Sequence, residues 1–324
     1  MSEMETTGKA PRIVSLLSSV TELLFALDVD TQLVGTSHEC DYPAGALEKT
    51  RVTGAHVDAT RSSSEIDDSV RDQLETRQSL YRLDVTTIRD LAPDVIITQA
   101  QCEVCAIHYD EVVELVRAEP ALRDTQILAL HSNTWDQVFQ DMVTVGDAIG
   151  CRSRVERLVE SYQERIRSIA ERLETAAVER PRVICVEWID PLMVSGNWVP
   201  TLVEKAGGRH GISDENVPSQ YYPWSRVQEF DPEFLVVCPC GFDVERSCQE
   251  LHLLKDLPGW RSLSAVRDDR VVVLDGNAYL NRSGPRLVET VEILAHLMHP
   301  EWIDSPVLPV ASGKPWYHWK QDRA

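Results

Sequence analysis

Positive charge is scarce in this sequence of 324 residues. Lys and Arg together number 32 against 52 Asp and Glu, which gives a formal net charge of −20 at pH 7. An acidic excess of this size repels nucleic acid phosphates and anionic membrane surfaces. The sequence also has no apolar run long enough to span a bilayer. We therefore expect neither a nucleic acid partner nor insertion into a membrane.

Motifs of nucleotide and ester chemistry are missing as well. The sequence has no Gly-x-x-x-x-Gly-Lys-Ser/Thr loop, no Gly-x-Gly-x-x-Gly after a strand and no Gly-x-Ser-x-Gly elbow. ATP hydrolysis, Rossmann dinucleotide binding and α/β-hydrolase chemistry therefore lack support. We assign no catalytic residues and expect a binding protein rather than an enzyme.

The N-terminal segment lacks targeting signals. Residues 1–11 are short and polar, without the charged start and apolar core of a signal peptide and without a Cys placed for lipid attachment. We expect these residues to be disordered and the protein to be cytoplasmic. In a reducing cytoplasm the eight Cys would be thiols or metal ligands rather than disulfides.

Alternating strand and helix patterns are what the sequence does have. Two blocks of this kind flank one helical pattern from Thr134 to Glu179, which contains no Pro and has Gly146 and Gly150 as its weak points. The pattern predicts an α/β fold with two Rossmann-like lobes, each with a central parallel sheet, joined by one long backbone helix. An ordinary surface helix inside one large domain is the alternative.

This organisation divides the chain into five segments. They are a disordered N-terminus (1–11), an N-terminal lobe (12–131), a linking backbone helix (132–180), a C-terminal lobe (181–299) and a C-terminal tail packed on the surface (300–324).

An internal repeat supports two related lobes. Residues 89–98 and 228–237 each read as the end of a helix, a Pro turn and a buried strand. Each strand is followed by a Cys pair, in one case Cys-x-x-Cys and in the other Cys-Pro-Cys-Gly.

The candidate site lies in the loops that follow the strands. In open α/β sheets ligands bind beyond the carboxyl ends of the strands, where loops and helix N-termini converge. If both lobes turn those edges toward one cleft, their polar and aromatic side chains meet. The candidate ligand contacts are Ser18, Ser19, His38, Glu39, Tyr42, Glu187, Trp188, Trp198, Phe242, Asn277, Tyr279, Asn281 and Arg282. For the aromatic residues core packing is the alternative, and for the Arg a solvated face.

Cysteine placement raises a second possibility. Cys102 and Cys105 have the spacing of two thiolates that bind one metal, and Cys40, Cys238 and Cys240 could complete a zinc or iron–sulfur site. Thiol redox chemistry and plain packing of small buried side chains are the alternatives. The other three lie on predicted helix or strand interiors and read as structural: Cys151, Cys185 and Cys248.

His38 beside Glu39 offers two further roles. Imidazole titrates near neutrality, so this pair could act in acid–base chemistry or offer an axial ligand to a metal. A His that is hydrogen-bonded within a loop is the alternative.

Three segments and four loops of the sequence resemble a known family. Arg12-Ile-Val-Ser-Leu-Leu-Ser-Ser-Val-Thr-Glu-Leu-Leu, Leu33-Val-Gly and Leu91-Ala-Pro-Asp-Val-Ile-Ile-Thr are similar to the helical-backbone (class III, TroA-like) substrate-binding proteins of ABC importers, over about residues 11–298. The branch labelled cobalamin-binding is resembled by four loops: Ser37-His-Glu-Cys-Asp-Tyr-Pro, Cys102-Glu-Val-Cys-Ala, Cys238-Pro-Cys-Gly-Phe-Asp and Asp275-Gly-Asn-Ala-Tyr.

The resemblance implies two lobes on one long helix and a flat chelate, such as cobalamin, a siderophore or haem, held in the cleft. Two functions follow. The first is a soluble binding protein for cobalamin, another corrinoid or a related metal chelate, with an ABC importer permease as its possible partner. The alternative is a cytoplasmic metalloprotein or enzyme with a Cys-ligated zinc or iron–sulfur site in the same cleft. We favour the first because of the fold.

Overall fold

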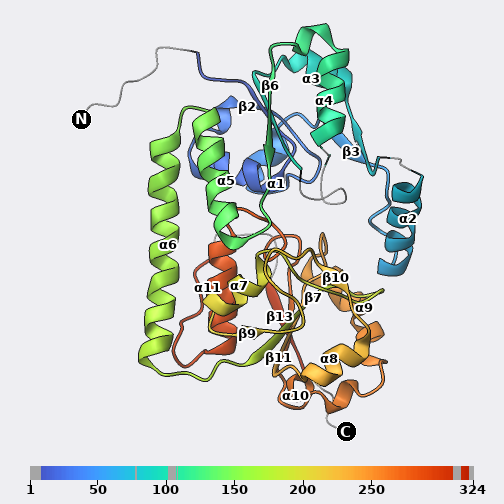
Figure 1. Ribbon diagram of the computed structural model, residues 1–324, viewed down its shortest axis with the longest axis vertical. Coiled ribbons are helices and arrows are strands. Elements are labelled where there is room, and N and C mark those ends of the chain that lie inside the picture. The colour runs from blue at the N-terminus through green and yellow to red at the C-terminus, as the bar shows by residue number, and fades with distance from the viewer. Residues whose placement is uncertain (1–8, 77–78, 101–106, 108, 309–314, 321–324) are drawn as a thin grey trace. The chain divides into compact units, whose positions relative to one another are not determined.

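The computed structural model describes residues 9–76, 79–100, 107, 109–308 and 315–320 (Figure 1). Contacts divide the chain into two compact units. Unit 1 comprises Met1–Asp58, Ser69–His131 and Gln137–Glu160, and unit 2 comprises Ala59–Asp68, Ser132–Asp136 and Ser161–Ala324. The predicted domain boundaries follow the sequence order and remain predictions.

Unit 1 contains a parallel sheet with the strand order β2-β1-β5-β6. Its strands are β1 (Ile13–Ser15), β2 (Leu33–Thr36), β5 (Val95–Gln99) and β6 (Gln126–Leu130). The helices that accompany it are α1 (Ser18–Ala26), α2 (Ser63–Glu75), α3 (Val85–Leu91) and α4 (Tyr109–Ala118). α2 begins in the part of the chain assigned to unit 2. Figure 1 shows α4 beside β6. An antiparallel pair that the sequence did not predict consists of β3 (Thr53–Ala55) and β4 (Tyr81–Leu83).

Unit 2 contains a mixed sheet whose centre is parallel. The parallel strands are β7 (Arg182–Trp188), β9 (Arg209–His210), β11 (Phe234–Val237) and β12 (Val271–Leu274). The antiparallel additions are β8 (Met193–Val194), β10 (Gln220–Tyr221) and β13 (Trp316–Trp319). The helices are α7 (Val199–Lys205), α8 (Trp224–Phe230), α9 (Val244–Lys255), α10 (Ser264–Arg267) and α11 (Leu287–Met298). The predicted α/β fold with two parallel-sheet lobes is confirmed.

The central strands are apolar because helices and loops bury them on both faces. Leu235, Val237, Val271 and Val273 are fully buried in the core of unit 2, and Val14 and Ile96 are fully buried in the core of unit 1. Such continuous apolar runs are typical of parallel strands, which is why the sequence predicted them correctly. The structure also contains short 3₁₀ turns at Asp30–Gln32, Ala44–Glu48, Pro120–Leu122 and Trp260–Ser262.

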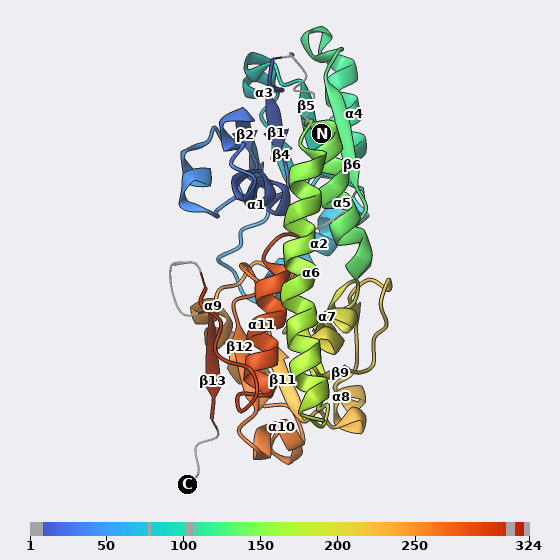
Figure 2. The ribbon, with the colours of Figure 1, turned by 90° about the vertical axis from the view of Figure 1, so that its left-hand side faces the viewer.

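The predicted long helix is present, but its predicted bounds, Thr134 to Glu179, are wrong. The structure has two helices that lie side by side in Figures 1 and 2, α5 (Trp135–Ala148) and α6 (Arg152–Thr175), and the long helix α6 has residues in both units. Gly150 adopts the left-handed conformation with φ of 73°, which a Gly accepts without a steric cost, and the chain reverses there. Gly146 lets the helices approach, because a Cβ on it would come within 2.7 Å of Val155.

The internal repeat is confirmed in backbone detail. α3 ends on Ala92 with φ of 42°, directly before Pro93, and α8 ends on Asp231 with φ of 47°, directly before Pro232. In each unit a left-handed residue therefore stops the helix, and Pro starts the turn into the central strand.

Part of the C-terminal tail forms a strand, which the sequence did not indicate. Residues Trp316–Trp319 pair antiparallel with β12, and Figure 2 shows β13 beside it. The Trp319 ring lies 5.7 Å from that of Trp260, centroid to centroid.

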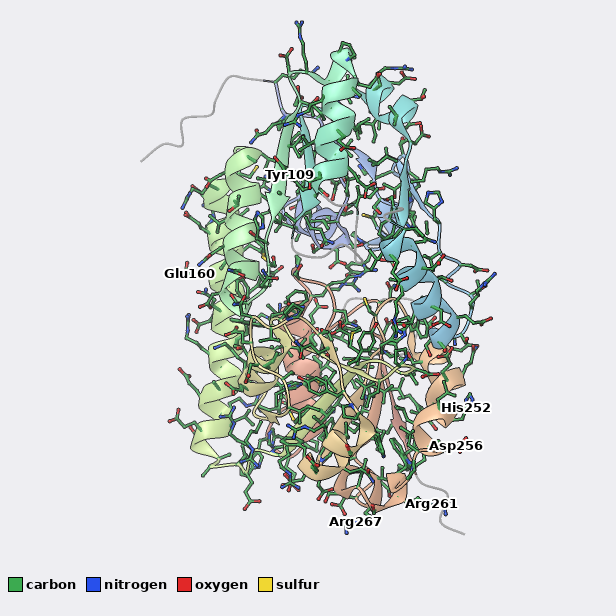
Figure 3. The ribbon with its side chains drawn as sticks, turned by 45° about the vertical axis from the view of Figure 1, so that its right-hand side comes forward. Tyr109, Glu160, His252, Asp256, Arg261 and Arg267 are labelled. Carbon is green, nitrogen blue, oxygen red and sulfur yellow. The ribbon has the colours of Figure 1, made fainter. Side chains whose placement is uncertain are left out.

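On α9, Figure 3 shows His252 and Asp256 pointing outward, and both are exposed. Among the described residues, helices that combine the length and the apolar character needed to cross a membrane are absent.

Candidate functional site

The carboxyl edge of the unit 2 sheet brings together two of the predicted loops. β11 and β12 are parallel neighbours, so the loops after Val237 and Leu274 leave the same edge. Asn281 ties them, because its Nδ2 donates to the carbonyl oxygens of Cys238 (2.8 Å) and Gly276 (3.1 Å). A Cβ on Gly276 would lie 2.2 Å from the carbonyl oxygen of Pro239. The two loops therefore form one tightly packed pair.

Several candidates belong to this loop pair. The backbone N–H of Asn277 donates to the carbonyl of Phe242 (3.1 Å), and the Arg282 guanidinium donates to Asn277 Oδ1 (2.7 Å). Asp275 accepts from the backbone N–H of Ala278 (2.8 Å). Burial raises the pKa of the Asp275 carboxyl, while that hydrogen bond acts in the opposite direction. The edge therefore presents carbonyl and carboxyl oxygens, with Arg282 already bound to a protein group.

Glu187 lies near the end of β7, at the same edge. Its Oε2 accepts a hydrogen bond from Ser219 Oγ (2.8 Å). Burial raises the pKa of the Glu187 carboxyl, and the Ser219 hydroxyl partly offsets this. No local sequence pattern indicated Ser219, because it reaches Glu187 from a segment 32 positions later.

The aromatic candidates divide into buried and partly covered side chains. Trp198, Phe242 and Tyr279 are only 7%, 4% and 3% exposed. The Trp198 indole N–H donates to the carbonyl of Leu280 (2.9 Å), which fastens the start of α7 to the loop after β12. The Trp188 ring lies 5.2 Å from that of Phe242, and its N–H donates to the carbonyl of Ser63 (3.1 Å). Core packing accounts for Trp198 and Tyr279, so a ligand role for these two stays a prediction.

The carboxyl edge of the unit 1 sheet gathers a second set. Ser18 Oγ donates to the carbonyl of Glu39 (2.7 Å). His38 Nδ1 lies 2.6 Å from Thr53 Oγ1, and its Nε2 lies 3.1 Å from Glu39 Oε1, an ion pair when the imidazole is protonated. The structure therefore brings Ser18, His38 and Glu39 together, and adds Thr53 from β3, which the sequence did not indicate.

Although Ser is a common N-cap, the N-cap residue of α1 is Leu17, and Ser18 is the first helical residue. The Ser18 hydroxyl instead joins two loops of the edge, as described above. Ser19 and Tyr42, the remaining candidates of this unit, are half-buried.

Of the cysteines predicted as metal ligands, the structure describes Cys40, Cys238 and Cys240. Cys40 in unit 1 is fully buried and accepts from Thr21 Oγ1 (3.1 Å). Cys238 in unit 2 is fully buried, and burial raises the pKa of its thiol well above the ordinary value, whereas Cys240 is exposed. Cys151, Cys185 and Cys248 are free thiols. Cys102 and Cys105 lie outside the described residues.

The metal-site alternative finds no support in these positions. Across the described ranges, groups of three or more His, Cys, Asp or Glu side chains placed to hold a metal are absent.

Sequence reasoning missed one segment at the unit 2 edge. Residues 59–68 contain none of the predicted site residues, yet Ser63 contacts Trp188. The available signal was local. Ser62 and Glu65 form a capping box, with the backbone N–H of Ser62 donating to Glu65 Oε2 (3.1 Å) and the backbone N–H of Glu65 donating to Ser62 Oγ (3.4 Å). That motif predicts a helix start and does not reveal what the helix contacts.

Known proteins are similar to this chain over most of its length. Residues 13–278 match the family model described as periplasmic binding protein. The Bacillus subtilis protein named uncharacterized ABC transporter substrate-binding lipoprotein YvrC is 23% identical over 301 residues, covering 91% of this chain and 82% of its own. The vitamin B12-binding protein of Vibrio cholerae is 22% identical over 286 residues, covering 87% of each chain.

Solved structures share the fold. A periplasmic haem-binding protein from Pseudomonas aeruginosa superposes with a TM-score of 0.69 at 21% identity, covering 91% of this chain and 94% of its own. The periplasmic vitamin B12 binding protein BtuF of Vibrio cholerae superposes with a TM-score of 0.63 at 20% identity, covering 90% and 97%.

These relatives contradict the prediction of a cytoplasmic protein. They are named as a lipoprotein or as periplasmic proteins, which points to a location outside the cytoplasm. The prediction rested on the composition of residues 1–11, and that short stretch carries no information about where a protein of this fold works. Without a cytoplasmic location, a reducing compartment is no longer a reason to expect the Cys to be thiols.

Both units carry a parallel sheet with its helices, and the family model matches most of the chain. The chain therefore belongs to the periplasmic binding protein family, the substrate-binding proteins of ABC importers.

Proposed function

We propose that this protein binds a cobalamin or another corrinoid at the carboxyl edges of its parallel strands and delivers it to an ABC importer permease. The names of two relatives support this class of ligand, because one binds vitamin B12 and another binds haem. Both ligands are flat metal chelates, so the choice between them depends on the chemistry of the edge itself.

The observation that carries the choice is the chemistry of the unit 2 edge. Two of its cations bind protein groups: Arg282 donates to Asn277, and Arg246 pairs with Glu250. Its oxygen atoms include the carboxyls of Glu187 and Asp275, both with raised pKa values. Haem carries carboxylates that need cationic or N–H donors, whereas a corrinoid carries peripheral carboxamides that donate hydrogen bonds to such oxygens. The net charge of −20 also disfavours an anionic ligand.

Titration of the purified protein with aquocobalamin and with haem tests this proposal. Equilibrium dialysis followed by absorbance should show stoichiometric binding of aquocobalamin, at least about tenfold tighter than haem. Tight haem binding without corrinoid binding would refute the ligand assignment. Binding of neither would refute the whole proposal.

A variant pair locates the site. Asn281→Ala removes the tie between the loops after β11 and β12, and should weaken corrinoid binding by about tenfold or more. Gln140→Ala, on the exposed surface of α5, is the control and should bind like wild type. Equal affinity of both variants would place the ligand elsewhere.

The permease partner has its own test. Liposomes that contain a corrinoid ABC importer should take up corrinoid when this protein is added, and should not do so with buffer alone. Uptake that is independent of the protein would argue against a delivery role.

A further inference from the structure

Residues 59–68, which we call the strap, belong to unit 2 by their contacts, although the chain before Ala59 and after Asp68 belongs to unit 1. The strap contains the N-cap and the first turns of α2. Three side chains from three separate elements of unit 2 contact it: Trp188 at the end of β7, Tyr221 in β10 and Glu250 in α9.

The backbone of Ser63 is held on both sides. Its N–H donates to both carboxylate oxygens of Glu250, at 3.0 and 3.1 Å, and its carbonyl accepts the indole N–H of Trp188 at 3.1 Å. Ser63 is fully buried and Glu250 is 5% exposed. A carboxylate at this place satisfies an N–H at the start of α2 and complements the positive end of the helix dipole.

Two further contacts fix the strap at its ends. Arg246 forms an ion pair with Glu250 and donates to the carbonyl of Arg61 (2.6 Å). Tyr221 donates its hydroxyl to Asp67, a buried residue of the strap. The strap is therefore attached at Arg61, Ser63 and Asp67.

These attachments are of a kind that can be released. They are hydrogen bonds, and on detachment water can replace the protein partner at a small net cost. Glu250 keeps its ion pair with Arg246 when the strap leaves, so no buried charge is left unpaired. Ile66 is the buried apolar side chain of the strap, so the apolar area lost on detachment is small.

The strap lies on the pair of rings that marks the unit 2 edge. Trp188 contacts both Ser63 and the Phe242 ring, and the carbonyl of Phe242 accepts the backbone N–H of Asn277 from the loop after β12. We propose that the strap is a latch over this edge, and that it must detach from unit 2 before a ligand enters or leaves there. This inference rests on the proposed function for its ligand and on the contacts above for its mechanics.

The first test needs no ligand. Hydrogen–deuterium exchange of the intact protein should show slow exchange for peptides that span 60–68. Tyr221→Phe and Glu250→Gln should each speed that exchange by about tenfold, as expected for the loss of one hydrogen bond, and should leave peptides of β11 unchanged. Tyr222→Phe is the matched control, because the Tyr222 hydroxyl bonds to Gln220 Oε1 (3.5 Å), a residue outside the strap. Strap exchange that is the same in all four proteins would overturn the latch.

The second test measures gating. Stopped-flow mixing with aquocobalamin should give association and dissociation rates that both rise by about the same factor in Tyr221→Phe, with Kd nearly unchanged, and wild-type rates in Tyr222→Phe. Unchanged rates in a variant whose strap exchanges faster would overturn gating and leave the proposed function intact. If wild type binds no corrinoid or haem, the proposed function fails, and the strap fails as a gate even where exchange shows it attached.

Discussion

Arg182 makes in unit 2 the contact with a helix end that Arg12 makes in unit 1. The Arg12 guanidinium donates to the carbonyl of Leu91 at 2.8 and 2.9 Å, and the Arg182 guanidinium donates to the carbonyl of Asp231 at 2.7 and 2.9 Å. Their backbone N–H groups also correspond. Arg12 donates to the Asp94 carboxylate (2.7 Å) and Arg182 to that of Glu233 (2.9 Å). In both units the guanidinium thus satisfies carbonyls that the helix leaves open where it ends.

Replacing Arg182 with Met should lower the free energy of unfolding by about 1–3 kcal/mol. The change keeps the aliphatic stem and removes hydrogen bonds to the carbonyls of Phe230 and Asp231. Urea denaturation followed by circular dichroism measures it. Arg226→Met is the control, because the Arg226 guanidinium forms an exposed pair with Glu229, and the change should alter stability by less than about 0.5 kcal/mol. A similar loss in both variants would show that the helix-end contact adds nothing.

The sequence predicted the central strands well and the peripheral ones poorly. β7 and β12 carry their own signal, because each is an apolar run that stays buried. β8, β9 and β10 have two residues each, too few to show a periodicity, and their pairing depends on neighbours distant in the sequence.

The candidate site was predictable only where it follows from strand order. Ser18, His38 and Glu39 meet because parallel strands deliver their loops to one edge. The burial of Trp198 and Tyr279 depends on three-dimensional packing, which no local pattern encodes. The strap contact with Glu250 joins residues 187 positions apart, so spacing gave no sign of it.

Replacing Gly276 with Ala should disturb the loop pair at the unit 2 edge. The new Cβ would lie 2.2 Å from the carbonyl oxygen of Pro239 and 2.6 Å from that of Cys238, and backbone atoms cannot move aside as a flexible side chain can. We expect a loss of about 1–3 kcal/mol in stability and weaker corrinoid binding. Gly54→Ala is the control, because its nearest contact is the movable guanidinium of Arg82 at 3.3 Å. Wild-type melting and affinity in the Gly276 variant would show that the loops are not tightly packed.

Replacing His210 with Gln should make stability less sensitive to acid. Burial lowers the pKa of His210 from its ordinary 6.5 to about 4. Between these values the unfolded chain binds a proton that the folded chain does not, so stability falls as pH drops from about 6.5 to about 4. From about pH 7 to about pH 5 this one group accounts for a loss of about 2 kcal/mol.

Urea titrations of wild type and variant at the two pH values measure this difference. His252→Gln is the matched control, because Figure 3 shows His252 on the outer side of α9, where it is exposed. The His252 variant should lose as much stability on acidification as wild type, and the His210 variant about 2 kcal/mol less. Equal losses in all three proteins would show that His210 is protonated in the folded state.

Added salt should stabilise this protein near neutral pH, because its charges repel one another on average. With 52 acidic against 32 basic side chains, folding gathers a net charge of −20 into a compact volume. Raising NaCl from about 0.1 M to about 1 M shortens the screening length from about 10 Å to about 3 Å, which weakens that repulsion. A gain of roughly 1–2 kcal/mol would raise the melting temperature by about 2–4 °C for each kcal/mol in a chain of this size.

The same salt step at about pH 5.5, nearer the sequence pI of about 4.8, separates screening from a general salt effect. The rise in melting temperature should be smaller at about pH 5.5, since fewer carboxylates are ionised at that pH. An equal rise at both pH values would contradict the charge-repulsion account.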